Sequence, residues 1–128
     1  MRVLLVEDEG PLADTIARSL RARGYQTTVA PTGESAMAEL TRARPDVVVL
    51  DVNLPDLTGW DILRRLSESD QPRPGVVVIS AGPISQKRIE ELRPDKWLEK
   101  PFPLDALIRA LQELELSPSD GQEDGGRT

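Results

Sequence analysis

Several polar side chains stand where short apolar runs of the chain end, and together they could do chemistry. The run at residues 47–50, three valines and a leucine, is typical of a strand buried on both faces, and the carboxylate of Asp51 follows it directly. Similar runs precede other polar side chains. The set is Glu7, Asp8, Asp51, Ser80 and Lys100. If the runs are parallel strands, these groups meet at the carboxyl edge of one sheet, where open parallel sheets bind ligands.

Three carboxylates at one edge would form an oxygen-only site that suits a hard cation. We predict Mg²⁺, because it is typically held by one or two carboxylates together with waters and a phosphate, whereas Ca²⁺ prefers a larger oxygen cage. Two like charges about 5 Å apart repel by roughly 3 kcal/mol at an effective dielectric constant of about 20. Lys100 offsets part of that repulsion, and a divalent cation would relieve the rest and keep Asp51 ionised as a nucleophile. The residues therefore indicate an aspartyl phosphorylation centre.

The residue types that are missing limit the chemistry further. The chain has neither cysteine nor histidine, so it has no thiolate metal site and no imidazole base. Any phosphohistidine that takes part must come from another molecule. The net charge of -6 disfavours binding to a phosphate backbone, and we expect no direct nucleic-acid partner.

Helical periodicity separates the apolar runs, which predicts five strands alternating with five helices. Leu12, Ile16 and Leu20 recur at helical spacing, and Leu104, Leu107, Ile108, Leu111 and Leu114 form a second clear stripe. The more polar run at residues 25–30 is expected at a sheet edge. We predict an α/β fold, a doubly wound five-stranded parallel sheet in the flavodoxin-like order 2-1-3-4-5, with helices on both faces.

The length of 128 residues predicts one domain, which we place at residues 1–116. Residues 117–128 carry no apolar group to bury and are expected to form a disordered tail or the stub of a linker. The longest aliphatic runs have four or five residues, so we expect no transmembrane segment, signal peptide or membrane partner, and a cytoplasmic location.

The ordered set of motifs resembles the receiver domain of two-component response regulators over about residues 2–116. Residues 3–9 resemble the family's first strand and acidic pair, and residues 46–55 its phosphoacceptor strand and loop. Ser80 with Ala81 stands at the hydroxyl position, and Lys100 with Pro101 and Phe102 matches the lysine that precedes a proline.

The resemblance implies a role for each matching residue. Asp51 would accept a phosphoryl group from a histidine of a sensor kinase or phosphotransfer protein. Asp8, Asp51 and the backbone carbonyl of Asn53 would bind Mg²⁺, with Glu7 acting directly or through water. Lys100 would pair with a phosphoryl oxygen and Ser80 would move to bind another, which is the family's signal. Such a domain is no enzyme beyond its own phosphorylation and dephosphorylation, and Pro101 is expected in the cis form.

Two departures from the family pattern concern how the signal leaves the site. The position where the family has an inward-turning tyrosine or phenylalanine holds Trp97; a merely packed or partly exposed aromatic is the alternative. The stretch from Ser80 to Lys100 is short, and Arg93 and Pro94 replace the usual Gly-Ala pair. We therefore expect a short or displaced fourth helix. The strand ending at Ser80, that helix and the strand at residues 95–99 would form the switching face, through which a phosphorylation-dependent homodimer would assemble.

Three other functions stay open from the sequence. A degenerate receiver could serve as a constitutive protein-docking module, although the complete site argues against it. A magnesium-dependent aspartyl phosphatase would usually carry a second aspartate where this chain has Asn53. A flavin-binding module would need a phosphate loop after the first strand, and the acidic residues there would repel the flavin phosphate. The downstream partner would be a protein target or a fused output domain absent from this chain.

Overall fold

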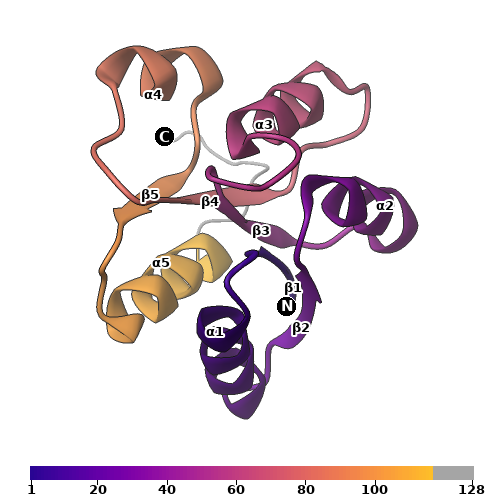
Figure 1. Cartoon of the computed structure of the whole chain (residues 1–128). Coiled ribbons are helices and arrows are strands. Elements are labelled where there is room, and N and C mark those ends of the chain that lie inside the picture. The colour runs from indigo at the N-terminus through magenta and orange to yellow at the C-terminus, as the bar shows by residue number, and fades with distance from the viewer. Residues whose placement is uncertain (117–128) are drawn as a thin grey trace.

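A computed structural model describes residues 1–116 as a five-stranded parallel sheet with helices on both faces (Figure 1). The strands are β1 (Arg2–Val6), β2 (Gln26–Ala30), β3 (Val47–Asp51), β4 (Gly75–Ser80) and β5 (Lys96–Glu99). The helices are α1 (Gly10–Ala22), α2 (Gly33–Ala43), α3 (Gly59–Glu68), α4 (Gln86–Leu92) and α5 (Leu104–Leu116). The strand order β2-β1-β3-β4-β5 confirms the predicted topology. The predicted tail at 117–128 lies outside the described residues.

Strict alternation along the central strands divides the core into two layers. Odd-numbered residues of β1, β3 and β4 pack with α1 and α5, whereas the even-numbered ones pack with the helices of the other face. Figure 1 shows α1 and α5 below the sheet and α3 and α4 above it. β3 is buried over its whole length, as its apolar run predicts, because a central parallel strand has helices on both sides. The polar strand β2 lies at the edge, as expected.

Local signals set the helix ends. Thr32 and Thr58 cap α2 and α3 by accepting hydrogen bonds from the N–H groups of Ser35 and Asp61. α1 ends at Ala22, and Gly24 then takes a φ of +93° to turn the chain toward β2.

The short fourth helix is confirmed. α4 has seven residues and ends where Arg93 adopts a left-handed conformation, with φ of 51°. Arg73 donates hydrogen bonds to the carbonyl oxygens of Leu92 (3.0 Å) and Arg93 (2.7 Å), which satisfies the end of the helix. The predicted fifth strand begins one residue late, at Lys96, because Asp95 uses its carboxylate to accept from Val76 N–H at 2.7 Å.

Within residues 1–116 no helix combines the length and apolar character that a membrane crossing requires.

Candidate functional site

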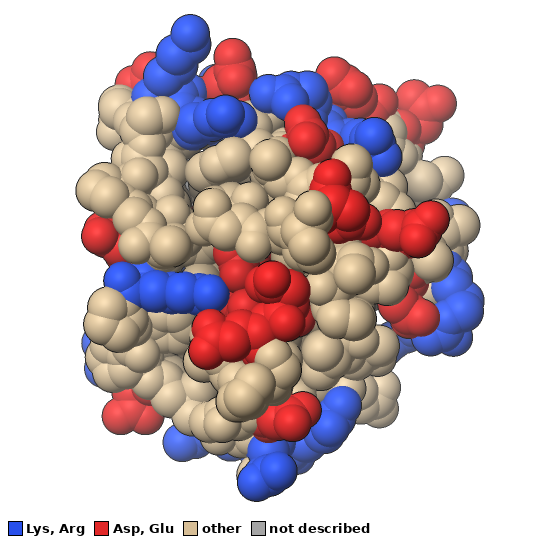
Figure 2. Space-filling model, in the orientation of Figure 1, with Lys and Arg blue, Asp and Glu red and all other residues tan. Residues whose placement is uncertain are grey.

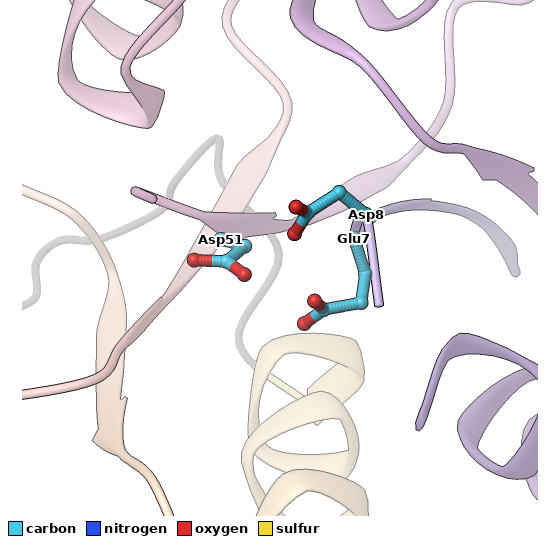
Figure 3. A group of neighbouring side chains, drawn as sticks. All are labelled: Glu7, Asp8 and Asp51. Atoms are coloured by element: carbon cyan, nitrogen blue, oxygen red, sulfur yellow. The ribbon is translucent and has the colours of Figure 1, made fainter. Parts of the chain in front are cut away.

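The carboxylates predicted to meet do so at the ends of β1 and β3. Parallel pairing joins Val6 to Leu50, so Glu7 and Asp51 follow side by side where the two strands end. Oxygen atoms of Glu7, Asp8 and Asp51 all lie within 4.8 Å of one another. Figure 3 shows the three side chains converging from the two strand ends. We call these three residues the acidic cluster.

The acidic cluster lies on an open face of the molecule. Figure 2 shows acidic side chains gathered at the centre of the face that Figure 1 presents, with basic side chains beside them. Asp8 is exposed, whereas Glu7 and Asp51 are each only 1 % exposed. The cluster therefore has one member at the surface and two buried beneath it.

Lys100 supplies the positive charge predicted for this edge. The Lys100-Pro101 peptide bond is cis, as expected, and the Lys100 N–H donates to the carbonyl of Ser80 at 2.7 Å. Its Nζ lies 3.1 Å from Asp51 Oδ2 and 3.2 Å from Glu7 Oε1. Burial disfavours the charged lysine, but the hydrogen bond and attraction of Asp51 and the charge of Glu7 outweigh burial and raise the pKa of Lys100. One ammonium group thus faces two buried carboxylates.

Glu7 is the buried carboxylate most affected by the negative charge that Lys100 leaves unbalanced. Its Oε2 accepts from the Glu9 N–H at 3.1 Å. Its Oε1 is buried and has no hydrogen-bond partner within residues 1–116, although Lys100 Nζ is within ion-pair distance. Burial, together with the neighbouring Asp51, raises the pKa of Glu7 to about 7. This buried carboxylate oxygen accepts no hydrogen bond from the described residues and lies beside two further carboxylates. Such a set of oxygen ligands fits a hard cation.

The raised pKa of Glu7 predicts an unusual pH dependence of stability without added metal. Native Glu7 holds its proton up to about pH 7, whereas the unfolded carboxyl loses it near pH 4.5. Between these values the native state binds more protons, so the free energy of unfolding should fall as the pH rises, by about 3 kcal/mol for this group at most. Urea unfolding in a chelator, compared with the Glu7→Gln variant, isolates the effect. Parallel pH profiles of the two proteins would contradict it.

Asp51 is held by the loop that follows it. The Asn53 N–H donates to Asp51 Oδ1 at 2.8 Å, and Asn53 Oδ1 accepts from the Ala81 N–H at 3.3 Å. Asn53 thereby joins the end of β3 to the end of β4. Gly59 serves a tight junction between this loop and α3, since a Cβ there would lie 2.6 Å from the carbonyl oxygen of Asp51.

The two residues predicted to sense the site lie around it rather than on it. The Ser80 hydroxyl is buried and donates to the Gly82 carbonyl at 2.6 Å, and no hydrogen bond joins it to Asp51 within the part of the chain that is described. Trp97 stands on the edge strand β5 and is 47 % exposed. The structure therefore brings together Glu7, Asp8, Asp51 and Lys100, places Ser80 and Asn53 beside them, and leaves Trp97 at the surface.

Asp56 contacts a distant helix, which the sequence did not indicate. Its carboxylate accepts from the N–H groups of Gly33 and Glu34 at the start of α2. The partners are 23 and 22 residues away, and an acidic residue after a proline in a loop carries no sign of such a contact.

Comparisons with known proteins agree with this geometry. The family model of the response regulator receiver domain matches residues 3–112. The probable transcriptional regulatory protein TcrX of Mycobacterium tuberculosis is 40% identical over 114 residues, which are 88% of this chain and 48% of that protein. The response regulator MprA of Mycobacterium leprae is 33% identical over 127 residues, covering 96% of this chain and 55% of that protein. The chain thus spans about half the length of the curated relatives it matches.

Solved structures show the same fold. The receiver domain of the Francisella response regulator 1452 aligns with a TM-score of 0.78 and 32% identity, over 87% of this chain and 93% of that one. The chemotaxis response regulator CheY4 of Vibrio cholerae aligns with a TM-score of 0.80 and 26% identity, over 88% of this chain and 96% of that one.

Proposed function

Since the chain belongs to the response regulator receiver domain family, we propose that Asp51 is its phosphoacceptor and that the acidic cluster binds the Mg²⁺ on which the reaction depends. One observation carries the proposal. Asp51 lies within 4.8 Å of two further carboxylates and 3.1 Å from the ammonium group of Lys100. A nucleophile, a cation site and a fixed positive charge are what phosphoryl transfer to a carboxylate needs.

The reaction would proceed by displacement at phosphorus. A carboxylate oxygen of Asp51 attacks the phosphorus of a phosphohistidine on a partner protein, the phosphorus–nitrogen bond breaks, and the histidine leaves with the bonding electron pair. The product is an acyl phosphate on Asp51. Bound Mg²⁺ would neutralise charge on the phosphoryl oxygens. Asp8, Asp51 and the carbonyl of Asn53 would hold the ion, and Glu7 would join directly or through water, which gives its unsatisfied Oε1 a partner.

Lys100 and Ser80 would bind the phosphoryl group on Asp51. Lys100 Nζ, now on Asp51 Oδ2, would pair with a phosphoryl oxygen. Ser80 would exchange its hydrogen bond to Gly82 for another phosphoryl oxygen, which requires the loop after β4 to move. That motion would reach the β4-α4-β5 face, where Trp97 has room to turn because it is half exposed. Hydrolysis of the acyl phosphate would reset the domain, so its own phosphorylation and dephosphorylation are the only chemistry that we assign to it.

The partners follow from this role. The phosphodonor would be a sensor histidine kinase or a phosphotransfer protein, because this chain has no histidine. Its relatives include transcriptional regulatory proteins about twice its length, so we propose a fused output domain or a separate protein target, with residues 117–128 as tail or linker after a domain at 1–116. We also propose a cytoplasmic location and a homodimer that depends on phosphorylation. The complete acidic site gives no support to a constitutive docking module. The phosphatase gains no support either, because the position of its second aspartate holds Asn53, whose side chain accepts a hydrogen bond from the Ala81 N–H.

Binding can be followed through the two tryptophans, Trp60 and Trp97. We expect a saturable fluorescence change on titration with Mg²⁺, and a second change when beryllofluoride, which mimics a phosphoryl group, is added with the metal present. The Asp51→Asn variant should lack the second change, because its amide cannot bond to beryllium. The absence of both responses in the unmodified chain would refute the proposal and leave the docking module.

A further inference from the structure

The loop between β3 and α3, residues 52–58, carries the proposed metal ligand and is anchored at both ends. At its start the Asn53 N–H binds Asp51 Oδ1 at 2.8 Å. At its end the Gly59 N–H donates to the carbonyl of Val52 at 3.1 Å. The middle of the loop belongs to neither strand nor helix, so the orientation of the Asn53 carbonyl depends on what holds that middle part.

Asp56 provides the hold, through two hydrogen bonds to α2. Its Oδ1 accepts from the Gly33 N–H at 2.8 Å and its Oδ2 from the Glu34 N–H at 2.9 Å. Both N–H groups lie in the first turn of the helix, where they have no partner within the helix, and the helix dipole favours a negative charge there. The same hydrogen bonds lower the pKa of the Asp56 carboxyl, so it is ionised at neutral pH.

A second, steric contact joins the same loop to the same turn. A Cβ at Gly33 would lie 2.7 Å from Leu57 Cβ and 3.1 Å from Asp56 Oδ1. The loop therefore packs directly on the backbone of α2, in space that only glycine leaves open at this position. The polar contact and the close packing thus hold the same loop against the same turn of α2.

We propose that Asp56 is a positioning residue that clamps the β3–α3 loop onto the first turn of α2 and thereby holds the Asn53 carbonyl in the orientation that binds Mg²⁺. The inference rests on the proposed function, since it concerns the same metal site. Coupling between two sites is reciprocal in free energy. Bound Mg²⁺ must therefore strengthen the hydrogen bonds that Gly33 and Glu34 donate to Asp56.

The first test compares the affinity for Mg²⁺ of four proteins by calorimetry. Asp56→Ala should bind Mg²⁺ about tenfold more weakly than the unmodified chain, at the lower end of what loss of an outer-sphere partner costs. Thr32→Ala removes the cap of the same helix, which accepts from the Ser35 N–H at 3.0 Å, but leaves the loop contact intact. It should bind Mg²⁺ within about twofold of the unmodified chain, because Asp56 keeps both of its hydrogen bonds to Gly33 and Glu34. Asp61→Asn removes a partly exposed carboxylate of α3, which pairs with Arg64 at 3.4 Å, and controls for the loss of one negative charge outside the loop.

The second test reads the clamp directly, by hydrogen exchange of individual amides. Mg²⁺ should slow exchange of the Gly33 and Glu34 N–H groups in the unmodified chain and in Thr32→Ala, and should leave it unchanged in Asp56→Ala. A residue that only stabilised α2 would not produce this metal dependence. Should Asp56→Ala fail to fold, Gly33→Ala displaces the loop while keeping the carboxylate, and it should also weaken Mg²⁺ binding.

The outcomes separate the inference from the function beneath it. Equal Mg²⁺ affinity in Asp56→Ala and Thr32→Ala, or in Gly33→Ala and the unmodified chain, would overturn the clamp and leave the proposed function standing. Hydrogen exchange at Gly33 and Glu34 that does not change with Mg²⁺ in the unmodified chain would also overturn the clamp and leave the proposed function standing. An unmodified chain that does not bind Mg²⁺ would refute both.

Discussion

Replacing Asp51 by asparagine should reduce phosphorylation of the chain by acetyl phosphate at least a hundredfold, a rough lower bound for loss of a catalytic nucleophile. The amide has nearly the shape of the carboxylate, so the hydrogen bond that Asp51 Oδ1 accepts from Asn53 survives. It carries no charge, however, and its oxygen cannot displace acetate from phosphorus. Intact-protein mass spectrometry in Mg²⁺ measures the bound phosphoryl group, which hydroxylamine should release as expected for an acyl phosphate.

Asp14→Asn provides a matched control for this variant. Asp14 is an exposed carboxylate on α1, and its replacement removes the same charge away from the acidic cluster. That variant should be phosphorylated like the unmodified chain. Continued stoichiometric phosphorylation of Asp51→Asn would mean that another carboxylate is the acceptor, with Asp8 the first to examine because it is the exposed member of the acidic cluster.

Replacing Gly59 by alanine should lower the free energy of unfolding by about 3 kcal/mol or more, the cost of forcing a group into filled space. Gly59 is the first residue of α3, where helix propensity alone would favour alanine by up to about 1 kcal/mol. The added Cβ would lie 2.6 Å from both the carbonyl oxygen of Asp51 and the Cα of Val52. Both are backbone atoms of β3 and the loop after it, which cannot rotate away, so sterics outweigh propensity. Urea unfolding measures the loss.

Gly10→Ala is the control that separates the two effects. Gly10 also opens a helix, α1, but a Cβ there would meet no atom within 4 Å. This variant should be neutral or more stable by up to about 1 kcal/mol. A similar change in the free energy of unfolding for both variants would show that helix propensity, and not the contact with β3, decides the outcome at Gly59. Because the clash lies at Asp51, Gly59→Ala should also slow phosphorylation.

Much of the fold was predictable because its signals are local. Apolar runs of four or five residues set the strands, helical stripes set most of the helices, and Thr32, Thr58 and Ser85 cap three of them. The bounds differ by a residue or two where tertiary contacts compete, as at Asp95, whose carboxylate binds Val76 N–H just before β5 begins. Helix α4 was expected to be short, but the hydrogen bonds from Arg73 that satisfy its end join segments 19 and 20 residues apart.

The sequence by itself determined which groups would face one another. In a parallel sheet every strand ends at the same edge, so the order of apolar runs and polar residues already places Glu7, Asp8, Asp51 and Lys100 together. Only the tertiary structure decided how these groups behave. The pKa of Glu7 depends on its burial and on the neighbouring Asp51. Glycine is needed at position 59 because the backbone of β3 passes close to it. Asp56 can bind α2 because the loop that carries it is folded against that helix. Solvation, packing and hydrogen bonding act across space between residues far apart in the chain, and a one-dimensional pattern does not record those distances.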